Sequence, residues 1–234
     1  MTLSKIFLLS LFFLISGSIN AVTASANEYS DARTLVERSS MVFQRFQEDP
    51  NMTWFRDNVQ YAKAIFIVPR LLKAGFVLGG SGGSGVLLSR DMKTRAWSYP
   101  VFYTMAAVSL GLQAGGEASE IILMIMTEKA MNSLLTTAFK LGADATVATG
   151  PVGTGVKAAA TDILAFARSK GAFAGISIEG AVITPHTKRN TAYYGKAVSP
   201  TDITIGQKVT NPHADALRAQ VSEKSKQTTI KVNY

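Results

Sequence analysis

A glycine-rich tract in the first half of the chain limits the folds that this sequence can adopt more than any other feature. Six of the eleven residues from 75 to 85 are glycine. The apolar triplets Phe76–Leu78 and Val86–Leu88 stand on either side of the densest part of the tract. A flexible linker lacks such apolar residues, whereas a buried strand needs them. The tract therefore predicts two strands joined by a glycine turn.

Several other short apolar runs have the length and the boundaries of buried strands. Ala64–Val68 ends at Pro69, and Ile121–Met126 is a second uninterrupted apolar run. Residues 162–180 contain positions that fit a helix, but the alternation around 169–171 better fits a hairpin. Further strands are expected at residues 98–103, 107–114 and 144–149.

Two segments have helical periodicity. Residues 28–48 place apolar side chains on one face, and the pattern ends at Asp49-Pro50 because a residue before proline is pushed out of the α region. A second helix begins at Thr127, carries Glu128 in its first turn and ends near Gly142. We expect an α+β fold, a single domain with a glycine-rich, mostly antiparallel sheet and a few packed helices.

The N-terminal residues have the pattern of a secretory signal peptide. One lysine precedes ten mostly apolar residues, and the small residues Ala24-Ser25-Ala26 follow at the positions that a signal peptidase recognises. We therefore divide the chain into a signal peptide (1–26), a domain (27–205) and a basic, flexible tail (206–234). The expected location is the periplasm or cell envelope, peripheral to the membrane.

Composition excludes several kinds of site. The chain has no cysteine and only two histidines, 27 residues apart, so we expect no metal, no cofactor and no thiol chemistry. The net charge is +8, with an excess of three positive charges over residues 62–120 and an excess of two negative charges over residues 27–61. A basic exported protein meets phospholipid headgroups far more often than nucleic acid, and no aromatic–basic RNA motif is present.

The glycine tract formally matches a catalytic motif, the G-x-S-x-G nucleophile elbow, at Gly79–Gly83. The elbow requires its serine on a sharp turn from a strand into a helix. A strand-like run, Val86–Leu88, follows here instead. We therefore expect no catalytic residues, and a serine hydrolase using Ser81 remains only a second alternative.

Several short motifs follow one another along the chain, among them Trp97-Ser-Tyr-Pro100, Gly150-Pro-Val-Gly153 and Phe173-Ala-Gly-Ile-Ser-Ile-Glu-Gly180. In this order they resemble a known family, the SYLF lipid-binding domains, which include the actin-regulator domain of yeast actin-patch proteins. The resemblance runs from about residue 62 to 202 and is most specific in the block Phe173-Ala-Gly-Ile-Ser-Ile-Glu-Gly180. Glu120 stands where the family usually has aspartate, and Thr154 stands where a basic residue often follows Gly-Pro-x-Gly. Other matching stretches are Gly111-Leu-Gln-Ala-Gly115 and Asn190-Thr-Ala-Tyr-Tyr-Gly195.

The resemblance implies a non-enzymatic protein that binds anionic phospholipid headgroups peripherally. Eukaryotic members are similar in binding lipid through a basic N-terminal segment, but residues 28–48 are not rich in lysine and arginine. We expect this helix to pack on its own domain, with membrane contact as the alternative. An envelope protein–protein interaction module is the alternative function. The expected headgroup-binding residues are Lys63, Arg70, Lys73, Arg90, Lys93 and Arg95.

The signal peptide gives a testable prediction. Because small residues occupy positions 24 and 26, the intact mass of the exported protein should correspond to a chain that begins at Asn27. Mass spectrometry of the protein recovered from the cell envelope measures this directly. A product that retains Met1 would contradict the expectation of export.

Overall fold

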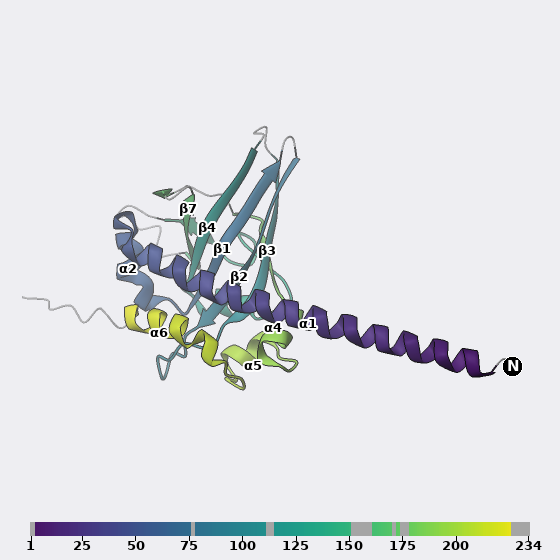
Figure 1. Ribbon diagram of the computed structural model, residues 1–234. Helices are drawn as coiled ribbons and strands as arrows, with labels where there is room; N and C mark the ends of the chain where they lie inside the picture. Colours follow the sequence, from purple (N-terminus) through teal and green to yellow (C-terminus); the bar gives the residue numbers. More distant parts are fainter. Residues whose placement is uncertain are drawn as a thin grey trace, which may run out of the picture.

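The computed structural model describes residues 3–75, 78–110, 115–150, 161–169, 172–173 and 178–225, with side chains of the first helix described from residue 25. Within these residues, nine strands form one sheet, and helices pack against it (Figure 1). The helices are α1 (Leu3–Glu48), α2 (Thr53–Asn58), α3 (Glu128–Leu134), α4 (Thr187–Tyr194), α5 (Pro200–Thr204) and α6 (Asp215–Lys224), with 3₁₀ turns η1 (Pro50–Met52), η2 (Val59–Tyr61) and η4 (Pro212–Ala214).

The sheet is antiparallel except at one edge. Its order is β5-β9-β3-β2-β1-β4-β7-β6, with β8 paired to β7, and only β6 and β7 run parallel to each other. The four longest strands are neighbours at the centre. The strands are β1 (Ala64–Gly75), β2 (Leu78–Ser89), β3 (Val101–Leu110), β4 (Gly115–Ile125), β5 (Phe139–Lys140), β6 (Val147–Thr149), β7 (Ile163–Ser169), β8 (Ala172–Phe173) and β9 (Val182–Pro185).

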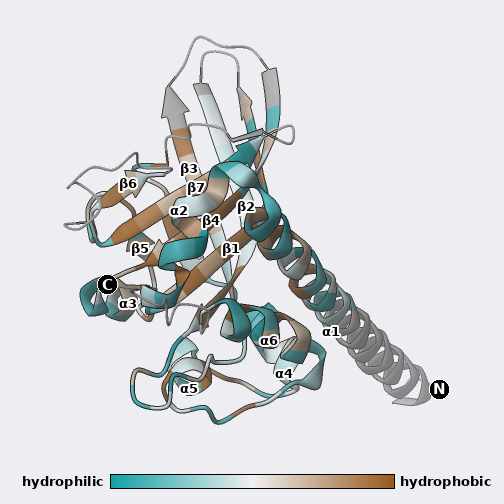
Figure 2. Cartoon of the chain, turned by 90° about the vertical axis from the view of Figure 1, so that its left-hand side faces the viewer, coloured by the Kyte–Doolittle hydropathy of each residue, from teal (hydrophilic) through white to brown (hydrophobic). Residues whose placement is uncertain are grey.

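The inner halves of the central strands are buried on both faces, which explains their continuous apolar runs. Successive side chains of a strand point to opposite faces. In β1, Ile65 and Ile67 belong to the core beneath α1, α2 and α6, whereas Phe66 and Val68 belong to the core on the opposite face. Figure 2 shows the hydrophobic stretches of β1 and β4 beside α2. The fold class expected from the sequence is confirmed.

Helix α1 covers one face of the sheet. Its residues Ala32, Val36 and Phe46 are fully or almost fully buried, and the helix ends at Glu48 as expected. Asp49 then caps η1, because its side chain accepts a hydrogen bond from the Asn51 amide at 2.9 Å. α1 also continues through the residues that the sequence analysis assigns to a signal peptide. No helix in the described ranges is long and apolar enough to cross a membrane.

Two local predictions are confirmed. Thr127 caps α3, since its side chain accepts a hydrogen bond from the Ala130 amide, and Glu128 lies in the first turn. The helix is shorter than expected, however, because it ends at Leu134 rather than near Gly142. The antiparallel pairing predicted on either side of residues 169–171 is present between β7 and β8, whereas residues 170–171 and 174–177 lie outside the described residues.

The prediction that the glycine tract forms a turn between two strands is wrong. The tract is not a connection but most of strand β2, and its residues pair with β1 on one side and with β3 on the other. β1 also continues past Pro69, with a shift of register between Val68 and Leu71. Two separate predicted strands, 98–103 and 107–114, overlap a single strand, β3, which begins at Val101 and ends at Leu110, and residues 111–114 lie outside the described residues. Hydrogen bonding from both neighbours therefore outweighs the weak strand preference of glycine.

The prediction of a flexible tail from Gly206 onward is wrong for residues 206–225. Ala214, Leu217 and Val221 are buried in the core beneath α1, and Ser40 of α1 donates a hydrogen bond to Gln220 of α6 at 2.6 Å. The sequence is polar over this segment, but its few apolar residues recur at helical spacing. The remainder of the predicted tail, 226–234, lies outside the described residues.

The close packing around β2 predicts which glycines the fold requires. A Cβ atom at Gly85 would lie 2.6 Å from the Ile67 carbonyl oxygen, whereas one at Gly82 would meet only the Met105 carbonyl oxygen, at 3.9 Å. Gly85→Ala should therefore lower stability by about 1–3 kcal/mol, which corresponds to a fall in Tm of roughly 2–12 °C. Gly82→Ala is the matched control. Equal thermal denaturation midpoints for the two variants would contradict this packing.

Candidate functional site

The six basic residues expected to contact headgroups do not form one surface. Lys63 lies at the start of β1 and forms an ion pair with Glu128 at 3.1 Å. Lys93 and Arg95 lie in the exposed turn between β2 and β3, at the same end of the sheet. Arg70 and Lys73 lie in the outer half of β1. Ten residues of strand separate Lys63 from Lys73, which is about 30 Å.

Arg90 is not on the surface, and its assignment to headgroup binding is wrong. It is 6% exposed, and its guanidinium donates hydrogen bonds to the backbone carbonyls of Gln60, Arg95 and Ser225. It also lies over the Trp97 ring, 5.7 Å from the centroid. Burial lowers the pKa of the Arg90 guanidinium below its usual value, and the charge of Arg95 lowers it further. Arg90 thus holds three chain segments together.

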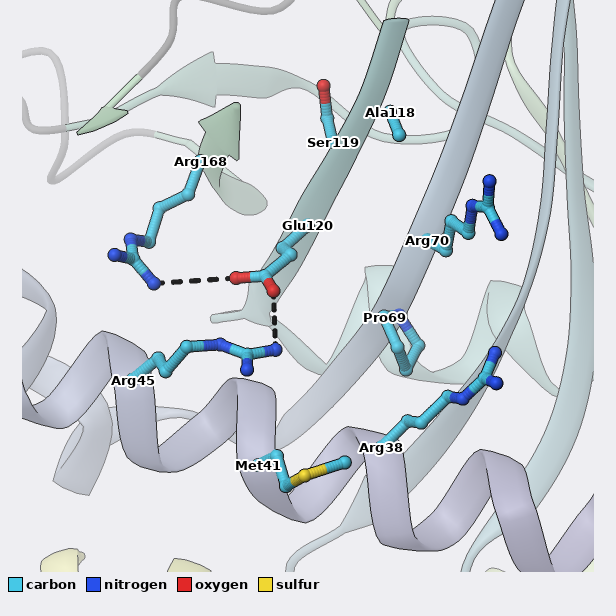
Figure 3. Close-up of a pocket in the computed structure, with 9 residues that line it drawn as sticks. All are labelled: Arg38, Met41, Arg45, Pro69, Arg70, Ala118, Ser119, Glu120 and Arg168. Atoms are coloured by element: carbon cyan, nitrogen blue, oxygen red, sulfur yellow. Dashed lines mark hydrogen bonds and ion pairs between the residues drawn. The ribbon is translucent and has the colours of Figure 1, made fainter. Parts of the chain in front are cut away.

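A cavity of about 480 Å³ brings together a different set of basic residues, between α1 and the sheet (Figure 3). It contains four arginines and one glutamate, a net charge of +3. α1, β1, β4 and β7 each contribute to its wall. The lining residues are Arg38, Met41, Arg45, Pro69, Arg70, Ala118, Ser119, Glu120 and Arg168.

Glu120 forms ion pairs with two of these arginines, as Figure 3 shows. Arg45 of α1 lies 2.5 Å from one carboxylate oxygen, and Arg168 of β7 lies 3.4 Å from the other. Arg168 also contacts Asp49, at 3.0 Å between Nε and Oδ2, and both side chains are almost buried. These pairs connect the end of α1 to β4 and β7. They also neutralise one end of the cavity.

The other end of the cavity keeps its positive charge. Arg38 of α1 and Arg70 of β1 both line it and are exposed. Among the hydrogen bonds and ion pairs of the described residues, neither arginine has an acidic partner. A guanidinium presents five donors in a planar fork that matches a carboxylate or a phosphate. This end of the cavity is therefore suited to an anion.

The glycine tract does not place Ser81 in the geometry of a nucleophile elbow. Ser81 lies within β2, paired to Lys73 and Ala107, and not at a turn from a strand into a helix. The geometry therefore contradicts the nucleophile elbow. Over the described ranges, no group of three histidine, aspartate or glutamate side chains could hold a metal ion.

Only Arg70 of the cavity arginines was among the expected headgroup-binding residues. Arg38 and Arg45 could have been grouped from sequence, because residues seven apart share one face of a helix. Arg168 and Glu120 come from strands that pair directly, with Glu120 opposite Arg168. Only the three-dimensional structure shows that this pair of residues contacts α1, through Arg45.

Comparison with known proteins supports the family resemblance. The model of the Ysc84 family, described as Las17-binding protein actin regulator, matches residues 106–224. "Protein YSC84" of Saccharomyces cerevisiae is 32% identical over 182 residues, which cover 72% of this chain and 38% of that protein. "SH3 domain-containing YSC84-like protein 1" of Homo sapiens is 28% identical over 151 residues, which cover 62% and 44% respectively. The chain thus spans less than half the length of these relatives.

The placement of Arg90 gives a prediction that separates a structural role from a surface role. Arg90→Gln should destabilise the fold by about 1–3 kcal/mol, because it leaves buried carbonyl oxygens without a donor. Urea denaturation measures the change, and Lys93→Gln in the neighbouring exposed turn is the control, with an expected change within about 0.5 kcal/mol. Two variants of unchanged stability would show that the Arg90 hydrogen bonds contribute nothing.

Proposed function

This chain belongs to the Ysc84 family, and we propose that it is a non-enzymatic protein that binds anionic phospholipid headgroups at a membrane surface. The relatives are named as binding proteins and regulators, which supports a role without catalysis. The observation that carries the proposal is the arginine cavity with its unneutralised end. The phosphate of a headgroup would provide the acidic partner that Arg38 and Arg70 lack among the described residues.

The position of the cavity favours a ligand that arrives from outside. Arg38 and Arg70 are exposed, so a phosphate reaches them without opening the core. Each cation near an anionic surface contributes about 1 kcal/mol. The interaction should weaken as salt rises, because the Debye length at physiological ionic strength is about 8 Å.

We also propose that the protein acts after export. The signal-like sequence at residues 1–26 supports export to the cell envelope, where phospholipid surfaces are an abundant anionic partner. A second candidate function is binding to an envelope protein. It is favoured by the relative named "LAS seventeen-binding protein 3" of Saccharomyces cerevisiae, whose name describes a protein partner.

Co-sedimentation with vesicles tests the lipid proposal. The exported protein should bind phosphatidylcholine vesicles that contain phosphatidylglycerol, and should not bind vesicles of phosphatidylcholine alone. The double variant Arg38→Gln/Arg70→Gln should lose about 2 kcal/mol of binding free energy, or roughly 30-fold in affinity.

The matched control removes the same charge elsewhere. Lys93→Gln/Arg95→Gln changes two exposed cations of the β2–β3 turn and should stay close to wild type in affinity. Equal losses in the two double variants would mean that overall charge, and not the cavity, governs adhesion. Absence of wild-type binding to anionic vesicles would overturn the lipid function and leave the protein partner as the better candidate.

A further inference from the structure

The outer halves of β1, β2, β3 and β4 extend beyond the helices as a four-stranded projection (Figure 1). β9 pairs with β3 only as far as Ala106, and β7 pairs with β4 only from Ser119 inward. The projection therefore has its own two faces. Directly paired residues point to the same face of a sheet, so the register assigns each side chain to one of them.

The face on the α1 side is apolar. One cross-strand row consists of Ala118, Leu72, Gly82 and Ala106, and the next consists of Gly116, Ala74, Gly80 and Val108. Leu72 is 47% exposed and Val108 is 86% exposed. The first row continues into β9 at Val182, which is 37% exposed. Within β1–β4 these two rows, which we call the outer apolar face, contain no charged or polar side chain, and beyond Val182 the first row ends at Lys140 of β5.

On the opposite face, the row next to the buried residues Leu71 and Met105 is polar at three of its four positions, and Ala107 is the fourth. There Lys73 pairs with Glu117 of β4 and with Ser81 of β2. Strands that are exposed on both faces need no apolar side chains on either face. The two faces of the projection therefore differ, because only the face on the α1 side has exposed apolar residues. Exposed Leu72 and Val108 are therefore a feature of one surface and not of the whole projection.

Glycine in the outer apolar face is not required by the packing of the chain itself. A Cβ atom at Gly80 would meet only the Ala107 carbonyl oxygen, at 3.6 Å, and one at Gly82 would meet only that of Met105, at 3.9 Å. Both are ordinary contact distances. Gly83 and Gly85 differ, because a Cβ atom there would clash with the backbone of β1. The bare surface over Gly80 and Gly82 is thus open to an external group.

The outer apolar face is continuous with the arginine cavity. Ala118 and Arg70 line the cavity, and Ala118 is paired directly with Leu72. Glu120, two residues along β4 from Ala118, is on the same face and reaches Arg45. A cationic cavity at the base and an apolar surface leading away from it match a molecule with an anionic head and a hydrocarbon chain.

We propose that this surface holds the acyl chain of an individual anionic lipid, with its phosphate between Arg38 and Arg70. The inference rests on the proposed lipid-binding function and adds that the chain of the lipid, and not its headgroup alone, contacts the protein. Four neighbouring strands about 4.7–4.9 Å apart provide a width of roughly 14 Å for that contact. The charge at one end of the face distinguishes a lipid from a purely apolar partner.

Calorimetric titration with monomeric lysophosphatidylglycerols of increasing chain length tests the proposal. Full burial of a methylene corresponds to about fourfold in affinity, and a face that covers one side of the chain should give roughly twofold per methylene. Leu72→Gln/Val108→Gln should remove this dependence while leaving binding of the chain-free headgroup, glycerophosphoglycerol, unchanged. The control Met92→Gln/Ile205→Gln alters two other exposed apolar residues and should leave the dependence intact.

The outcomes separate this inference from the proposed function. Wild-type binding to anionic vesicles with no dependence on chain length would overturn the acyl-chain contact while the headgroup function stands. Binding of neither vesicles nor lysolipids would overturn both. Self-association that Leu72→Gln/Val108→Gln abolishes, without chain-length dependence, would assign the face to a second copy of the chain. If the double variant melts early, Val108→Gln alone provides the comparison, because that side chain is mostly in solvent.

Discussion

Aromatic side chains pack α1 against α2 and α2 against strand β7, and the position of α1 over the sheet depends on this packing. Phe43 and Phe46 of α1 both contact the Phe55 ring edge-on, at 5.9 Å between centroids, and Phe55 contacts Phe166 of β7 at 5.3 Å. All four rings are fully buried or almost so. Edge-to-face pairs contribute about 0.5–1.5 kcal/mol each beyond their buried area. They also fix the rotation of α1 about its axis, which decides where its arginines point.

The charge of the cavity is a consequence of that docking. With Phe43 and Phe46 directed at the sheet, Arg38, Met41 and Arg45 line the gap beside it. Arg45 then meets Glu120, and Arg168 meets both Glu120 and Asp49. The positive charge that remains at Arg38 and Arg70 is therefore held by a rigid framework. The framework fixes the positions from which the two exposed side chains extend, and the side chains themselves lose rotamer freedom when they bind an anion.

Sequence could predict the features that depend on neighbouring residues. The amphipathic pattern of 28–48, the cap at Thr127 and the antiparallel pairing on either side of 169–171 are local, and each is present. The glycine tract was misjudged because its strand character comes from pairing with β1 and β3, which its own residues do not encode. The sequence does not predict α6, because its segment is polar and has only three buried apolar residues. These three are enough to hold the helix in place, since they pack in the core beneath α1.

The candidate site was harder to predict than the fold. Arg38, Arg70 and Arg168 lie far apart in sequence, and a charge count cannot distinguish an exposed arginine from a buried one such as Arg90. Glu120 was noticed only as a departure from the family pattern, whereas its register opposite Arg168 explains what it contacts. Burial and strand register, both tertiary properties, supplied what the sequence lacked.

A double-mutant cycle between Arg38 and Arg70 tests most directly whether α1 and the sheet share one anion site. The affinity of phosphatidylglycerol vesicles would be measured for wild type, Arg38→Gln, Arg70→Gln and the double variant. If one phosphate bridges both guanidinium groups, the two losses should be non-additive by at least about 0.5 kcal/mol, while Arg38 paired with Lys93 should show additive losses. Additive losses for Arg38 and Arg70, to within about 0.3 kcal/mol, would contradict a shared site.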